Sequence, residues 1–324
     1  MISFSSCNIR KGLLALLIGS MVVTSSCHHK PEDIEPKIDY AIQDKYLLSL
    51  PTPFTALTAE ERLERWSEEY RIGIGFAHEL DLYQAITAFK RSYFLVPQEK
   101  QERKKEIQYE ILLCYYLGRK YQDVIQTFES TELRYTDSTF PAFHDLLVIL
   151  YDSYMKEGED DKAQKYLSCL HNLYPETAEK LYVSSELSSG DIEQVQLISE
   201  HPAYAYVQDF LASYEREKKS VQTAKSLNAV LPGAGYLYLG QKQSALTAFL
   251  LNALFIGATY YFFAKGNIPA GVIFTSFESG WYFGGIYGAG EEAKFYNEHI
   301  YEKYATPMMN ENKLFPGFMI DYAF

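Results

Sequence analysis

Two glycines in the segment LPGAGYLYLGQKQ, residues 231–243, stand at the spacing of a phosphate-binding loop. Such a loop reads G-x-x-x-x-G-K-[ST] and cradles an anion with its backbone N–H groups. Gly235 and Gly240 fit the two glycines, but the lysine comes one place late, and Gln243 follows it where a Mg²⁺-binding hydroxyl is needed. The interior Tyr-Leu-Tyr-Leu is bulky and apolar. We therefore interpret the stretch as a turn that leads into an apolar segment, and not as a nucleotide site.

Side chains in other catalytic or metal-binding patterns are missing from the sequence. The seven histidines are scattered, and no Ser/His/Asp, Cys/His or metal-ligand spacing is present. The net charge of −12 is spread along the chain, which argues against a nucleic-acid partner. The sequence thus predicts neither an enzyme nor a protein that carries a metal ion or a cofactor.

Asn252 and Glu278 are the conspicuous polar residues of two apolar runs near the end of the chain. Residues 245–264 carry no charge, and residues 268–290 carry only that of Glu278. About 20 apolar residues span a bilayer core, so the two runs and their short connection predict a transmembrane helical hairpin. Counted from that connection, Asn252 and Glu278 lie 13 and 11 residues into their runs. At about 1.5 Å per residue their depths differ by about 3 Å, so we expect an interhelical hydrogen bond between them.

The second run also carries small residues four positions apart, at Ser276, Gly280, Gly284 and Gly288. Small residues at this spacing let another helix approach closely, within the hairpin or in a homo-oligomer. Glu278 allows a second interpretation, in which it moves a proton or an ion. The protein would then be an accessory subunit of a channel or transporter.

The first residues of the chain have the plan of an export signal. A basic pair precedes the apolar residues 12–23, and small residues lead to Cys27. This order resembles a bacterial lipoprotein signal, in which the cysteine is acylated, although Thr24 replaces the leucine usual in that family. An uncleaved membrane anchor is the alternative, and either one places the following chain outside the cytoplasm. Residues 28–57, which carry four prolines and mixed charges, predict a tether.

A self-match with a period of 39 residues follows the tether. It begins after Thr58 and Glu61, which have the spacing of a helix capping box. The matching positions are Gly73, Phe76, Ala85, Phe89 and Pro97, then Leu112, Tyr115, Val124, Phe128 and Thr136, then Tyr151, Tyr154, Ala163, Leu167 and Pro175. The period predicts an array of helix pairs over residues 58–200.

These positions resemble the tetratricopeptide repeat (TPR), and the match covers residues 66–176. The resemblance implies that a small residue lets the two helices of a pair cross closely, and that the inner helices line a concave groove. The groove positions here are mainly apolar and aromatic, and include Tyr70, Ile74, Tyr109, Leu113, Tyr116, Asp152 and Met155. They lack the lysine and asparagine with which chaperone-binding members hold a carboxylate, so an apolar peptide is the expected ligand. The alternative is that some of them pack against a further helix, within residues 203–229.

Residues 231–297 resemble a small bacterial membrane family of uncharacterised function. The resemblance rests on LPGAGYLYLG, FESGWYFGGIYGAG and AKFYN, and it implies membrane residence without any catalytic residue. The last residues, FMIDYAF, alternate like the closing strand of an outer-membrane barrel. One strand cannot close a barrel, so we interpret them as a tail or interface segment.

The sequence as a whole predicts an all-α protein, a TPR-like α-solenoid followed by a transmembrane helical hairpin. The expected parts are a signal (1–27), a tether (28–57), helical repeats (58–200), a connecting helix (201–230), a hairpin domain (231–305) and a tail (306–324). We expect a scaffold that binds proteins or peptides of the bacterial cell envelope. The inner membrane with periplasmic repeats is favoured over the outer membrane. A biogenesis factor similar to outer-membrane assembly lipoproteins built from TPRs is a further alternative.

Overall fold

The structure is a computed structural model that describes residues 34–38, 44–47 and 49–324. The export signal and the lipidation site predicted at Cys27 lie outside the described residues. All regular elements in the described part are helices, and no strand occurs there, so the all-α prediction is confirmed. The described chain forms two compact units. We call residues 35–218 with 297–324 the repeat unit, and Ile34 with residues 219–296 the hairpin unit.

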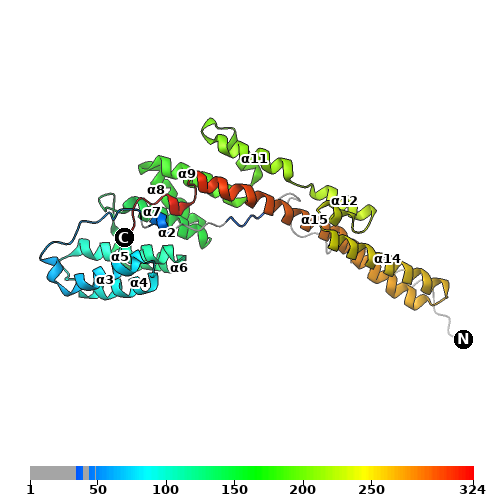
Figure 1. Ribbon diagram of the computed structural model, residues 1–324, viewed down its shortest axis with the longest axis horizontal. Coiled ribbons are helices and arrows are strands. Elements are labelled where there is room, and N and C mark those ends of the chain that lie inside the picture. The colour runs from blue at the N-terminus through cyan, green and yellow to red at the C-terminus, as the bar shows by residue number, and fades with distance from the viewer. Residues whose placement is uncertain (1–33, 39–43, 48) are drawn as a thin grey trace, which may run out of the picture. The chain divides into compact units, whose positions relative to one another are not determined.

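The repeat unit consists of helices joined by short connections (Figure 1). They are α2 (Asp44–Leu47), α3 (Arg65–His78), α4 (Leu82–Leu95), α5 (Gln101–Leu117), α6 (Tyr121–Ser130), α7 (Phe143–Lys156), α8 (Asp160–Leu173), α9 (Pro175–Ser189), α10 (Ile192–Ser199) and α11 (Ala205–Glu217). Short 3-10 turns are η1 (Glu61–Leu63), η2 (Glu132–Tyr135), η3 (Pro202–Tyr204) and η4 (Pro316–Phe318). Consecutive helices from α3 to α9 pack on one another, and α5 also contacts α7.

The turns inside the helix pairs repeat with the period found in the sequence. Leu80, Arg119 and Gly158, each 39 residues from the next, have positive φ angles of 56°, 56° and 73°. The residue after each of them donates its N–H to the carbonyl five positions earlier, over 2.9 Å in all three turns. A left-handed residue with such a bond is a common way to end a helix. The pairs α3–α4, α5–α6 and α7–α8 therefore have the same backbone conformation at the turn between their two helices.

The first helix pair also shows why a small residue is needed where its helices cross. A Cβ atom on Gly73 of α3 would lie 2.6 Å from the ring of Phe89 in α4. The capping box is formed as predicted, because Thr58 N donates to Glu61 Oε2 over 2.9 Å and Glu61 N donates to Thr58 Oγ1 over 3.2 Å. It precedes the short turn η1, however, and α3 begins only at Arg65.

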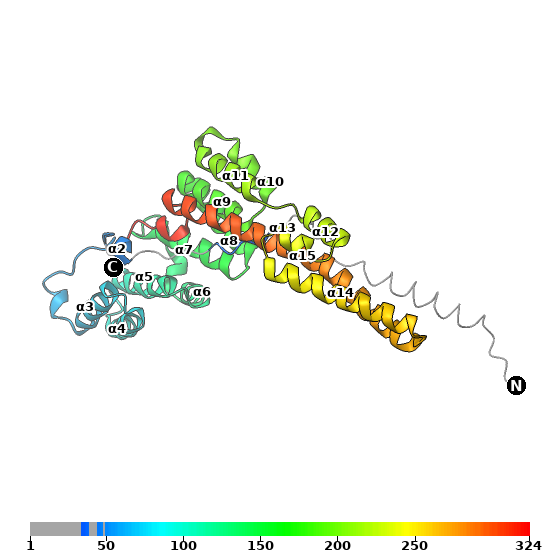
Figure 2. The same cartoon turned by 45° about the vertical axis from the view of Figure 1, so that its right-hand side comes forward.

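The hairpin unit contains α12 (Val221–Val230), α13 (Ala234–Tyr238), α14 (Lys242–Ala264) and the first part of α15 (Ile268–Glu311). Figures 1 and 2 show α14 and α15 side by side, joined by a tight turn. Aromatic rings hold them together, with ring centroids 5.1 Å apart for Phe262 and Phe274. Helix α15 is continuous for 44 residues, and its residues 297–311 belong to the repeat unit.

One helix among the described residues, α14, is long and apolar enough to cross a membrane. The second predicted span, residues 268–290 of α15, does not meet that criterion. Its small and hydroxylated residues and Glu278 lower the mean hydropathy, although they leave the helix intact. The structure therefore contains the predicted helical hairpin but a single candidate span.

Two predicted segments differ in the structure. The connecting helix expected over 201–230 is broken, because α11 ends at Glu217 and Ser220 caps α12 by accepting the N–H of Thr223 over 3.1 Å. The described part of the predicted tether is not free chain. Its apolar side chains pack on the core of the repeat unit, through Tyr46, Leu47, Leu50, Phe54 and Leu57.

Candidate functional site

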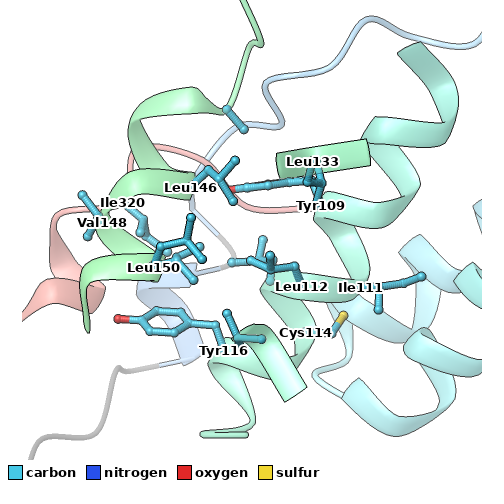
Figure 3. Close-up of a cluster of buried hydrophobic side chains, with 14 of the residues drawn as sticks. Tyr109, Ile111, Leu112, Cys114, Tyr116, Leu133, Leu146, Val148, Leu150 and Ile320 are labelled. Atoms are coloured by element: carbon cyan, nitrogen blue, oxygen red, sulfur yellow. The ribbon is translucent and has the colours of Figure 1, made fainter. Parts of the chain in front are cut away.

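The groove predicted from the sequence is lined by the inner helices α3, α5 and α7. Figure 3 shows Tyr109 and Leu112 of α5 facing Leu146 and Leu150 of α7. Of the predicted groove residues, Ile74 and Met155 are half-buried. The others are buried, namely Tyr70, Tyr109, Leu113, Tyr116 and Asp152. We call the surface formed by these seven residues and Asp145 the groove.

Two segments of the same chain cover part of the groove, and each contains a helical turn as well as chain without regular secondary structure. The first is residues 46, 47 and 49–57, here called the leading segment, whose Phe54 ring lies 5.7 Å from that of Tyr109. The second is residues 316–324, here called the tail, in which Ile320 is 1% exposed. Figure 3 shows Ile320 beside Val148 of α7. Two of the groove residues, Tyr109 and Asp145, thus contact other segments of the same chain, and these segments were predicted as a tether and a tail.

Asp145, at the start of α7, holds the backbone of the tail. Its two carboxylate oxygens accept the N–H of Asp321 over 3.0 and 3.1 Å, and one also accepts the N–H of Tyr322 over 2.9 Å. His144 Nδ1 lies 2.8 Å from the same carboxylate. Burial raises the pKa of Asp145, while His144 and the two backbone N–H groups oppose that shift. All three hydrogen bonds that the Asp145 carboxylate accepts from the tail come from backbone N–H groups, so this carboxylate can hold chain of varied sequence.

Arg103 of α5 binds the backbone of the leading segment. Its guanidinium donates to the carbonyls of Thr55, over 2.8 Å, and Ala56, over 3.2 Å. It also forms ion pairs with Glu61 at 3.0 Å and Glu106 at 2.7 Å. The hydrogen bonds from Arg103 lower the pKa of Glu61 to about 2. A half-buried cation, Arg103, thus binds carbonyl groups of the leading segment, and a buried anion, Asp145, binds N–H groups of the tail.

The two segments also bind each other. Ala323 donates its N–H to the carbonyl of Pro51 over 3.0 Å, and the Tyr46 hydroxyl donates to the carbonyl of Phe318 over 3.0 Å. The rings of Tyr46 and Phe318 meet edge to face at 5.2 Å. The leading segment and the tail therefore form hydrogen bonds with each other as well as with the helices.

The interior of α5 carries polar groups that no sequence pattern indicated. Glu110 is fully buried, and neither of its carboxylate oxygens has a hydrogen-bond partner among the described residues. Burial, with the nearby charge of Glu106, raises the pKa of Glu110 well above its usual range. The hydroxyl of Tyr109 likewise has no partner in the described part of the chain, whereas Tyr116 donates to Asp152 over 2.8 Å. Unpaired buried polar groups lower the stability of the folded state, so Tyr109 and Glu110 are both expected to destabilise the fold.

His144, Asp145 and Asp321 form a group of three side chains whose ligand atoms lie within 4.8 Å of one another. No such cluster was expected from the sequence, because Asp321 is 176 positions from Asp145 and only folding brings them together. Both oxygens of Asp145 already accept backbone N–H groups, and a metal ion would have to displace them. We assign the cluster to holding the tail.

The glycine turn uses its backbone N–H groups within the hairpin unit. Asn228 Oδ1 accepts the N–H of Gly233 over 2.8 Å and that of Gly235 over 3.3 Å. A Cβ on Gly235 would lie 2.4 Å from the carbonyl oxygen of Ala224. These glycines therefore allow close packing of α12 and α13, as expected for a structural turn.

Comparison with known proteins gives no relative. No family model matches the chain, and no curated protein or solved structure matches it. The resemblances to TPRs and to a membrane family therefore rest on the residues and motifs quoted above.

The predicted hydrogen bond between Asn252 and Glu278 is wrong. Asn252 donates to the carbonyl of Ala248 in its own helix over 2.7 Å. Phe255, one turn further along α14, contacts this part of α15 instead. Its ring centroid lies 6.3 Å from that of Phe277, the neighbour of Glu278. A similar number of residues from the hairpin turn does not decide which side chains meet, because this also depends on the rotation of each helix.

The small residues Ser276, Gly280, Gly284 and Gly288 of α15 are here called the glycine face. Only part of this face packs closely against another residue of the chain. A Cβ on Gly280 or Gly284 would meet nothing within 4 Å, whereas one on Gly288 would lie 2.6 Å from the hydroxyl of Tyr236. Close approach within the hairpin unit therefore occurs at Gly288, and Gly280 and Gly284 face open space.

Proposed function

We propose that the protein is a membrane-anchored, TPR-like scaffold of the bacterial cell envelope that binds extended polypeptide segments in its groove. The observation that carries the proposal is the pair of N–H groups, at Asp321 and Tyr322, held by the single carboxylate of Asp145. Recognition of extended chain commonly combines backbone hydrogen bonds, which give affinity, with apolar pockets for alternate side chains, which give specificity. Asp145 and Arg103 can supply the first, and the apolar groove residues can supply the second.

The apolar surface of α14 supports residence in a membrane. The helix has 23 residues, and the most apolar part of it has a mean hydropathy of 1.6 and is only 11% buried. A soluble protein rarely leaves a contiguous apolar surface of this kind uncovered. Insertion of the hairpin would leave the repeat unit free to bind proteins at the membrane surface.

Peptide binding is tested with a chain that lacks residues 316–324 and a fluorescent peptide that has their sequence. The expected result is saturable binding by anisotropy, weakened about tenfold or more by Asp145→Asn, which corresponds to the loss of about 1.4 kcal/mol. A peptide with Ile320→Asp serves as the matched control and should not bind. Circular dichroism of the truncated chain shows whether it keeps its helices. A truncated chain that stays helical and ignores the peptide would refute the groove proposal.

The location of the repeat unit is tested by protease protection, with an antibody to the repeats. Digestion only after the outer membrane is opened would support a periplasmic repeat unit. Digestion in intact cells would place the repeats on the cell surface, and protection until lysis would place them in the cytoplasm. Either of these results would contradict the proposed location.

A further inference from the structure

A shallow, mainly apolar groove on the hairpin contains two solvent-shielded polar groups that lack a hydrogen-bond partner among the described residues. It has a volume of about 320 Å³ and lies between α14 and α15. Its lining residues are Ile256, Thr259, Tyr260, Phe263, Thr275 and Glu278. We call it the hairpin groove. It was not apparent in the sequence, because its two polar groups come from different helices.

Both polar groups are shielded from solvent and lack hydrogen bonds. Thr259 Oγ1 and Glu278 Oε2 have no partner among the described residues. Other hydroxyls of the hairpin behave differently, since Thr275 donates to Gly271 O over 2.8 Å and Ser279 to Thr275 O over 2.9 Å. Such bonding to the preceding turn is the usual way for a helical hydroxyl to satisfy itself. Thr259 does not use it, so its hydroxyl has no partner in the single hairpin and must turn toward the hairpin groove to meet one.

A partner for these groups must come from outside the single hairpin. In a bilayer no water is present to bind them, and interhelical hydrogen bonds between such side chains hold membrane helices together. A neutral carboxyl group and a hydroxyl can each donate and accept. The two groups are therefore complementary to each other, but within one hairpin they do not pair.

A second copy of the chain satisfies both groups at once. We propose that the hairpin groove is a homodimer interface inside the membrane, in which Glu278 of each copy binds Thr259 of the other. A two-fold axis produces both hydrogen bonds from one contact, because an isologous interface pairs the same patch with itself. The uncovered apolar side chains of Ile256 and Tyr260, 54% and 75% exposed, would be buried by the same contact. The inference rests on the proposed membrane residence.

This face differs from the glycine face. Gly280 and Gly284 follow Glu278 by two and six residues, which places them about 200° and 240° around the helix from it. The two faces of the hairpin can therefore be tested separately, with one as control for the other.

The test is disulfide cross-linking of the full chain in native membranes, in a background with Cys114→Ala and Cys169→Ala. Ile256→Cys reports on the hairpin groove, and Gly280→Cys reports on the glycine face. We expect a cross-linked dimer with Ile256→Cys and little with Gly280→Cys. Added Glu278→Leu or Thr259→Val should reduce the dimer at least about threefold, while Glu278→Gln, which keeps a donor and an acceptor, should retain it.

Three results would overturn the proposal. Cross-linking through Gly280→Cys alone would assign dimerisation to the glycine face. Equal cross-linking of Ile256→Cys with and without Glu278→Leu would show that the polar groups do not hold the dimer. Absence of any dimer, in a protein that resists extraction by alkaline carbonate, would show a monomer in the membrane. Extraction by carbonate would instead refute the membrane residence on which the inference depends.

Discussion

The carboxylate of Asp145 in α7 accepts a hydrogen bond of 2.9 Å from the backbone N–H of Tyr322, 177 positions later in the chain. Together with the bond from Asp321 N, it makes the tail part of the core of the repeat unit. Because the donors are backbone groups, the position of the tail depends on Asp145 more than on the side chains at 321 and 322. The same arrangement supports the proposal that the groove binds extended chain.

Asp145→Ala should release the tail. Hydrogen bonds to a charged group contribute about 1.5–3 kcal/mol each, so protection of the amides of Asp321 and Tyr322 from hydrogen exchange should fall by at least about tenfold. The control is Asp137→Ala, since the Asp137 carboxylate binds Thr139 in its own loop. Unchanged exchange at both amides would show that apolar packing alone holds the tail.

Gly73→Ala and Gly75→Ala should change stability in opposite directions. A Cβ at 73 would lie 2.6 Å from the buried ring of Phe89, whereas a Cβ at 75 would meet nothing within 4 Å. Overpacking typically costs about 1–3 kcal/mol, and alanine in a helix is about 0.5–1 kcal/mol better than glycine. Thermal unfolding of the two variants checks this, because both substitutions lie in α3 and add the same methyl group. A Gly73→Ala variant as stable as Gly75→Ala would mean that Phe89 moves aside freely.

The Glu110→Gln variant should become increasingly more stable than the parent chain as pH rises above about 4.5. Burial raises the pKa of Glu110 in the folded chain, so the folded state holds a proton that the unfolded state releases. Stability therefore falls as pH rises through this range, and glutamine, which does not titrate, removes that fall. Unfolding midpoints at pH 4 and pH 8 should differ less in the variant than in the parent chain. An unchanged difference would indicate that Glu110 is ionised or solvated in the folded protein.

Glu61→Gln should have the opposite pH dependence. Hydrogen bonds from Arg103 lower the pKa of Glu61 to about 2, so its contribution to stability is complete above about 4.5 and is lost as pH falls towards 2. The variant should be less stable than the parent by about 1–3 kcal/mol at pH 7, and the two should converge near pH 2. Urea unfolding at several pH values measures the difference. A constant difference across that range would mean that the carboxylate is not paired with Arg103.

The local sequence was enough to predict the helix pairs and their period. Aromatic residues 39 positions apart, such as Phe76 and Tyr115, mark equivalent helices, and the turns between the paired helices have the same backbone shape at Leu80, Arg119 and Gly158. Helix formation and helix ends depend on residues within a few positions of one another, which a sequence displays directly. The positions of Tyr109 on α5 and Asp152 on α7 follow from the same period, while their role in a groove stays a prediction.

Contacts between distant segments could not be read in this way. Nothing near Asp145 indicates that Tyr322 is its partner, and nothing in the proline-rich residues 28–57 shows that Phe54 packs on Tyr109. The hairpin shows the same limit, since the number of residues from the turn predicts the height of Glu278 but not the direction in which it points. The sequence by itself predicted the three helix pairs and their apolar faces, but not every helix boundary, since α3 begins only at Arg65 and the segment 201–230 is broken. Only the tertiary structure decided what covers those faces, because the pairing depends on helix rotation and on segments brought together across nearly the whole chain.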